Sequence, residues 1–241
     1  MLAMGRIEAI VFDVDNTLVD YYTMKMACVD AALDKMIARG LPVTDKREAS
    51  QIVDDVFRNF TWEDQKLFWH VAQYAGVTND VTLERFAQLG KTTYRRRQRD
   101  FLKPYEGVIE TLTLLREQKI DFAILSDAPR LKVFDRLCDA DLEHYFEDRV
   151  IGGDDNTEFR KPSPTAFTRV LRMLNRTSPQ GVLMVGDQPV RDIIGGKQYG
   201  FVTAWAKYGY IHKTDEAENG VKTRADYVLE QFSDLAAIVK T

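Results

Sequence analysis

The sequence predicts an α/β protein with a parallel sheet at its core and a bundle of four helices inserted after the first strand. Residues 7–12 (IEAIVF) form a short run rich in β-branched and aromatic side chains, which is typical of a buried strand. Residues 23–101 then have helical periodicity, and short apolar runs alternate with helical stretches after Pro104. Strands that alternate with helices favour a parallel sheet covered on both faces.

Four amphipathic helices are expected in the inserted segment, because apolar residues recur there with a period close to 3.6. These stretches cover residues 26–37, 52–60, 67–75 and 80–99. Gly40 and Gly76 follow the first and third stretches and are expected to end those helices. Residues 61–64 (TWED) resemble a capping box before the third helix. Four helices without a strand predict a small bundle.

The segment after Pro104 predicts the rest of the sheet and its covering helices. The expected strands cover residues 121–125, 149–151, 182–185, 201–206 and 226–229. The expected helices cover residues 108–118, 130–138, 164–174, 189–199 and 233–239. The chain therefore predicts two domains, a core formed by residues 1–20 and 100–241, and a helical domain formed by residues 21–99.

Polar residues follow several of the predicted strands and precede one helix, and these positions are the candidate functional residues. They are Asp13, Asp15, Ser126, Asp127, Lys161, Asp187 and Asp192. Because parallel strands end at the same edge of a sheet, residues that are distant in sequence are expected to meet there.

The chemistry of these residue types suggests phosphate and a metal ion. Carboxylates gathered at one edge repel one another unless a cation binds, and oxygen ligands suit Mg²⁺. Lys161 and the Ser126 hydroxyl supply hydrogen-bond donors for an anion, which a metal-storage site would not need. One carboxylate can act as a nucleophile toward phosphorus, and another two residues away can act as general acid and base.

The segments FDVDNTL, ILSDA, KPSP and VGDQPVRD resemble the four motifs of the haloacid dehalogenase (HAD) superfamily, in the family's order. The resemblance covers about residues 5–20 and 100–241. It implies a Rossmann-like core, and the inserted helices look like that superfamily's C1-type helical cap. All four motifs in order are much more specific than the first motif alone.

The resemblance also implies roles for the candidate residues. Asp13 matches the nucleophile and a Mg²⁺ ligand. Asp15 matches the general acid and base, with its backbone carbonyl also on the metal.

The remaining motif positions match binding groups. Ser126, with Asp127 beside it, resembles the phosphate-binding position, and Lys161 resembles the lysine that steadies the nucleophile and the phosphate. Asp187 matches the second metal carboxylate. Asp192 matches the distal acid, which in the family often acts on the metal through water, so it is included among the expected metal-binding residues.

Asp15 separates two branches of this superfamily. Dehalogenases that resemble this fold lack an acid at that position and use no metal. Its presence here favours Mg²⁺-dependent hydrolysis of a small phosphorylated metabolite. Phosphoglycolate, glyceraldehyde phosphate and nucleoside monophosphates all remain open as substrates, because the resemblance implies that cap surfaces select them.

Three other functions share parts of this residue pattern. A phosphosugar mutase of the same superfamily also has the acid at Asp15. A receiver-like signalling module also places an aspartate, a hydroxyl residue and a lysine around Mg²⁺, but the helical insert and Asp15 argue against it. A non-catalytic binding protein is disfavoured because every catalytic position is filled.

Simpler structural roles compete at individual positions. Ser126 and Asp127 could cap the helix that follows them. Arg95, Arg96, Arg97 and Arg99 form a basic run, for which a solvated helix face is favoured over a substrate clamp.

Composition narrows the class of partner. The net charge of −4 argues against a broad basic surface for nucleic acid. No apolar run approaches membrane length and no signal-peptide pattern is visible, so a cytoplasmic protein without a membrane partner is expected, as a monomer or homodimer. Cys28 and Cys138 are expected to be buried thiols rather than a disulfide or a zinc site.

Overall fold

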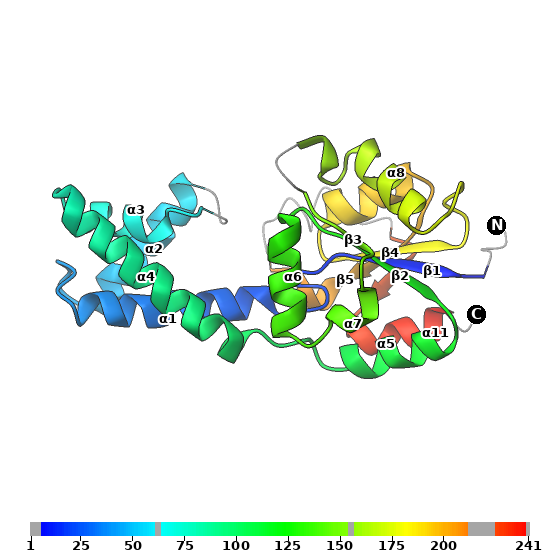
Figure 1. Ribbon diagram of the computed structural model, residues 1–241, viewed down its shortest axis with the longest axis horizontal. Helices are drawn as coiled ribbons and strands as arrows, with labels where there is room; N and C mark the ends of the chain where they lie inside the picture. Colours follow the sequence, from blue (N-terminus) through cyan, green and yellow to red (C-terminus); the bar gives the residue numbers. More distant parts are fainter. Residues whose placement is uncertain (1–5, 61–63, 154–156, 212–224, 240–241) are drawn as a thin grey trace. The chain divides into compact units, whose positions relative to one another are not determined.

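The computed structural model describes residues 6–60, 64–153, 157–211 and 225–239 (Figure 1). The chain divides into two compact units. The core unit consists of Met1–Tyr22 and Leu102–Thr241, and the helical unit consists of Thr23–Phe101. The capping box expected at residues 61–64 falls largely outside the described residues.

The core unit contains a six-stranded sheet in which each pair of neighbouring strands is parallel. The strands are β1 (Ala9–Phe12), β2 (Asp121–Leu125), β3 (Val150–Ile151), β4 (Val182–Gly186), β5 (Val202–Ala206) and β6 (Tyr227–Leu229). Their order across the sheet is β3-β2-β1-β4-β5-β6. This confirms the predicted Rossmann-like α/β fold, and it places the reversal of strand order between β1 and β4.

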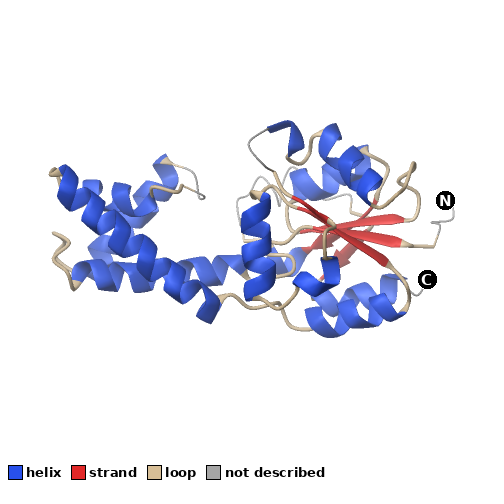
Figure 2. Cartoon of the chain, in the orientation of Figure 1, coloured by secondary structure: helices blue, strands red, loops and turns tan. Residues whose placement is uncertain are grey.

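Both faces of the sheet are covered by helices, as Figure 2 shows. Strand β1 is fully buried, because its side chains point alternately to the two faces of the sheet and helices cover both faces. Ala9 and Val11 belong to the apolar cluster that includes α8 (Pro164–Met173). Phe12 points to the other face, where its ring packs on Phe122, Phe146 and Phe232. A strand that is buried on both faces has a continuous run of apolar residues, which explains the apolar composition of residues 7–12.

The helices of the core unit follow the predicted order with short additions. They are α5 (Val108–Glu117), α6 (Arg130–Asp139), α7 (Glu143–Phe146), α8, α9 (Gly195–Gln198) and α11 (Leu235–Val239). The helix expected over residues 189–199 is instead a π-helical segment, η2 (Pro189–Ile194), followed by α9. Short 3₁₀ turns occur at η1 (Thr157–Phe159), η3 (Lys207–Gly209) and η4 (Phe232–Asp234).

The helical unit contains the four helices expected from periodicity. They are α1 (Tyr21–Ile37), α2 (Lys46–Asn59), α3 (Leu67–Tyr74) and α4 (Asp80–Phe101). Their apolar faces form one cluster of buried side chains that includes Leu33, Val56 and Phe86. The Asp45 carboxylate accepts a hydrogen bond from the Glu48 backbone N–H and caps the start of α2.

The basic run on α4 is exposed along its length. Arg95, Arg96, Arg97 and Arg99 are all exposed, and Arg97 pairs with Asp100 on the same helix.

The two cysteines differ in exposure. Cys28 is buried in α1, and burial raises the pKa of its thiol to about 12. Cys138 is exposed on the last turn of α6, so the expectation of a buried thiol is wrong there. The residues on the inner face of that helix are Val133, Arg136 and Leu137, and Cys138 falls outside this face.

None of the helices in the described part of the chain combines the length and apolar composition needed to cross a membrane.

Substitution of Phe167 tests how much the packing of α8 on the sheet contributes to stability. Its fully buried ring packs on Tyr199 and Phe201, with ring centroids 5.2 and 5.5 Å away. Phe167→Ala is expected to lower the free energy of unfolding by about 3–5 kcal/mol, because it leaves a cavity that the sheet cannot fill. Leu131→Ala, at a site that is 79% exposed, is the control and should change it by less than about 0.5 kcal/mol. Urea denaturation followed by circular dichroism measures both, and equal losses would contradict this view of the core.

Candidate active site

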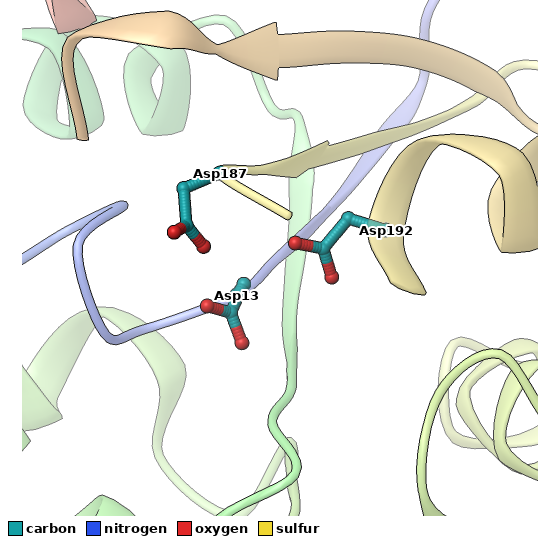
Figure 3. A group of neighbouring side chains, drawn as sticks. All are labelled: Asp13, Asp187 and Asp192. Carbon is teal, nitrogen blue, oxygen red and sulfur yellow. The ribbon is translucent and has the colours of Figure 1, made fainter. Parts of the chain in front are cut away.

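The predicted site residues meet at the carboxyl ends of β1 and β4, where the strand order reverses. Asp13 directly follows β1 and Asp187 directly follows β4, and both strands are buried along their length. Asp192 comes from the π-helical segment η2. Figure 3 shows the three side chains pointing toward one another.

These three residues form the carboxylate cluster (Asp13, Asp187 and Asp192). One ligand oxygen from each lies within 4.8 Å of the others. Asp192 is fully buried, Asp187 is 1% exposed and Asp13 is 7% exposed. The approach of Asp192 to β4 depends on Gly186, since a Cβ atom there would lie 2.2 Å from the Asp192 carboxylate. The backbone N–H of Gln188 donates to Asp192 and fixes its orientation.

Lys161 is the buried cation of this group. Its Nζ lies 2.6 Å from Asp13 Oδ1 and 2.7 Å from Asp192 Oδ1. Burial alone would lower the pKa of Lys161, but the carboxylates of Asp13, Asp192 and Asp127 outweigh it and raise the pKa. Lys161 is therefore an ammonium ion that bridges the nucleophile candidate and the distal acid.

One ammonium ion cannot satisfy three clustered carboxylates. Burial, together with the charges of Asp13 and Asp192, raises the pKa of Asp187 well above its usual value. Burial also raises the pKa of Asp192 to about 6, although Lys161 opposes the shift. Three ionised carboxylates here would therefore carry more negative charge than Lys161 offsets, in a region shielded from water.

This donor set fits a divalent cation. The cluster offers only carboxylate oxygens, which are the ligands that hard cations prefer. A cation among them would offset the repulsion that raises the pKa of Asp187 and Asp192.

Asp15 lies in the loop after β1 and is bound by an arginine that the sequence did not single out. Arg136 Nη1 is 2.5 Å from Asp15 Oδ2, and the guanidinium stacks 4.3 Å from the centre of the Tyr21 ring. Arg136 is only 7% exposed. On α6 it shares the inward face with Val133 and Leu137. A charged residue at an apolar position of a helix is the signal that could have found it.

Ser126 and Asp127 follow β2, and their contacts differ in range. Ser126 is 2% exposed, and its hydroxyl accepts a hydrogen bond from the Ala128 backbone N–H. Asp127 accepts one bond from the Lys161 backbone N–H at 2.7 Å and another from Arg191 at 3.0 Å. Asp127 therefore fixes the loop that carries Lys161.

Neither of these residues caps the helix that follows them. The N-cap position of α6 is Pro129, which has no side-chain cap.

The chain matches the family model described as "Hydrolase: haloacid dehalogenase-like hydrolase" over residues 7–200. It is 28% identical to a glyceraldehyde 3-phosphate phosphatase from Pyrococcus furiosus, over 98% of this chain and 95% of that protein. It is 29% identical to a phosphoglycolate phosphatase from Photorhabdus laumondii, over 97% of this chain and 92% of that protein.

Among solved structures, a putative beta-phosphoglucomutase from Thermotoga maritima has a TM-score of 0.73 and is 21% identical. The match covers 97% of this chain and 99% of that one. At this identity the likeness concerns the fold.

The chain belongs to the haloacid dehalogenase-like hydrolase family, because the family match spans most of its length. The predicted superfamily is confirmed, and both relatives described above are named as phosphatases, in agreement with the predicted phosphoric monoester hydrolase. Membership of a hydrolase family disfavours the receiver-like signalling module.

The raised pKa of Asp192 gives a pH dependence to the metal-free protein. An aspartate in the unfolded chain titrates near pH 3.9, whereas Asp192 in the fold titrates at about 6. Between these values the folded state holds a proton that the unfolded state has lost. The free energy of unfolding therefore falls as pH rises through this window, by up to about 1.4 kcal/mol per pH unit.

Asp192→Asn lacks this titration, so its unfolding free energy should fall less steeply between about pH 4 and pH 6. Urea denaturation of both proteins in a chelator measures the two slopes. Parallel pH profiles would show that Asp192 does not titrate in this range.

Proposed function

We propose that this chain is a Mg²⁺-dependent phosphatase that hydrolyses small phosphomonoester metabolites through a phosphorylated Asp13. The observation that carries this proposal is the bridge from Lys161 to both Asp13 and Asp192 inside a cluster of three carboxylates. It supplies a nucleophile, a fixed cation and an anionic pocket for a metal ion at one strand edge. In this proposal the core unit is the catalytic domain and the helical unit is the C1-type cap.

Asp13, Asp187 and Asp192, together with the backbone carbonyl of Asp15, would hold Mg²⁺. When bound, Mg²⁺ would offset the charge on the phosphate and the carboxylates.

The first step uses Asp13 as nucleophile. The bond from Lys161 to Oδ1 fixes the plane of the Asp13 carboxylate. A carboxylate oxygen of Asp13 forms a bond to phosphorus while the bond from phosphorus to the leaving oxygen breaks. Asp15 would hold a proton on Oδ1, while its Oδ2 contacts Arg136, and it gives this proton to the leaving oxygen. Lys161 and Ser126 are proposed to donate to the phosphoryl oxygens.

The second step restores the enzyme. Asp15, now a carboxylate, takes a proton from water. The water oxygen bonds to phosphorus, the bond from phosphorus to Asp13 breaks, and inorganic phosphate leaves. Arg136 would orient Asp15 through its 2.5 Å contact.

The relatives support small anionic substrates. One is named for glyceraldehyde 3-phosphate and another for phosphoglycolate, so both compounds belong at the head of a substrate panel. A cytoplasmic location, a monomeric or homodimeric state and the lack of nucleic-acid and membrane partners remain predictions.

Asp13→Asn is expected to reduce turnover of p-nitrophenyl phosphate with Mg²⁺ by at least about 10³-fold, because an amide cannot attack phosphorus. The matched control is Asp148→Asn at an exposed position of the same unit, which should keep wild-type activity. Activity that survived Asp13→Asn would contradict the assignment of Asp13 as the nucleophile. Phosphate release that matched substrate loss would separate hydrolysis from a phosphosugar mutase, which instead returns an isomer.

Asp15→Asn tests the general acid through the leaving group. A simple alkyl phosphate needs protonation of its leaving oxygen, whereas p-nitrophenolate leaves without it. The variant should therefore lose about tenfold more kcat/KM on the alkyl ester than on p-nitrophenyl phosphate. Steady-state kinetics on both esters measure this ratio. Equal losses on the two substrates would argue that Asp15 does not protonate the leaving group.

A further inference from the structure

The end of β5 and the 3₁₀ turn that follows it contact both loops that carry the site. The nucleophile loop (residues 13–19) follows β1, and the metal loop (residues 186–192) follows β4. Strand β5 lies beside β4 but two places away from β1 in the sheet. Residues 205–209 nevertheless contact both loops.

Tyr208 and Gly209 contact the nucleophile loop. The Tyr208 hydroxyl donates a 2.6 Å hydrogen bond to the backbone carbonyl of Thr17, a residue with no solvent exposure. Gly209 packs on the carbonyl oxygen of Asn16 so closely that a Cβ atom would lie 1.5 Å from it. Asn16 adopts the left-handed conformation, with φ of 57°, so the loop turns sharply at this contact.

Trp205 contacts the metal loop. Its indole Nε1–H donates a 2.9 Å hydrogen bond to the backbone carbonyl of Asp187. Trp205 is in register with Gly186 in the parallel pair of β4 and β5, so the sheet itself fixes where the indole lies.

Tyr105 packs against the side of the Tyr208 ring. The edge of its ring meets the Tyr208 ring at 72°, with centroids 4.9 Å apart. The Tyr105 backbone N–H donates to the Leu18 carbonyl at 3.0 Å. The nucleophile loop is thus held by uncharged bonds at two successive carbonyl groups.

We propose that Trp205, Tyr208 and Gly209 are positioning residues that hold the nucleophile loop and the metal loop in register, so that Asp13 and Asp187 stay close despite their repulsion. Clustered carboxylates push the two loops apart until a cation binds. Uncharged bonds to backbone carbonyls resist that force without changing the charge of the site. The inference rests on the proposed function for its kinetic consequence, whereas the restraint on the loops can be tested without it.

Tyr208→Phe removes one hydroxyl and keeps the ring. It is expected to lower kcat for p-nitrophenyl phosphate about five- to tenfold, with KM changed less than about twofold, because the nucleophile loop loses one hydrogen bond. Deuterium uptake should rise in the peptide that covers residues 14–19. Tyr227→Phe, on the neighbouring strand β6, is the matched control and should change neither measurement.

Trp205→Phe and Gly209→Ala separate the two contacts. Trp205→Phe should weaken Mg²⁺ binding about fivefold by calorimetry, since it frees the Asp187 carbonyl. Gly209→Ala should lower kcat about 100-fold, because the new Cβ displaces the nucleophile loop. Circular dichroism checks that each variant folds.

The proposal is overturned if Tyr208→Phe behaves like Tyr227→Phe in both kcat and deuterium uptake. If the wild type hydrolyses no phosphomonoester, the proposed function fails. Unchanged uptake in Tyr208→Phe would then still contradict the positioning role, and increased uptake would still support it.

Discussion

The site depends on one electrostatic constraint, which is that three buried carboxylates share one buried ammonium ion. Lys161 lies within 2.7 Å of both Asp13 and Asp192, while Asp187 stands nearby. Such an arrangement is unfavourable for three full negative charges, and a divalent cation bound among them would make it favourable. The same charge imbalance therefore explains both the raised pKa values of Asp187 and Asp192 and the fit of the cluster to a metal ion.

Contacts from the surrounding fold hold Lys161 and the three carboxylates together, and these contacts do not change the net charge of the cluster. Asp127 holds the Lys161 backbone and is itself neutralised by Arg191. Gly186 lets Asp192 approach β4. The second acid, Asp15, is kept out of the cluster's charge balance by its own partner, Arg136. Neighbours from several elements of the core unit thus fix these side chains, and under the proposed function this favours reaction because little reorganisation is needed.

Much of the fold and the core of the site could be predicted from the sequence. Strand ends are local features, so the apolar run before Asp13 and the run before Asp187 already placed both acids at one sheet edge. Arg136, Trp205 and Tyr208 were not found, because their roles depend on partners that are distant in sequence. The π-helical form of residues 189–194 was also missed. A π-helix and an α-helix have similar patterns of buried residues in the sequence, so the sequence does not distinguish them. Here the π-helical segment carries Asp192, whose carboxylate accepts a hydrogen bond from the Gln188 backbone N–H.

The central claim is that Asp13 carries the phosphoryl group during turnover. The most direct test uses Asp15→Asn, in which attack by water on the intermediate should be slow. After brief incubation with p-nitrophenyl phosphate and Mg²⁺, acid quenching and digestion, mass spectrometry should find one phosphoryl group on the peptide that contains Asp13. Substrate consumption without a phosphorylated Asp13 peptide, or a phosphoryl group on another residue, would contradict the account.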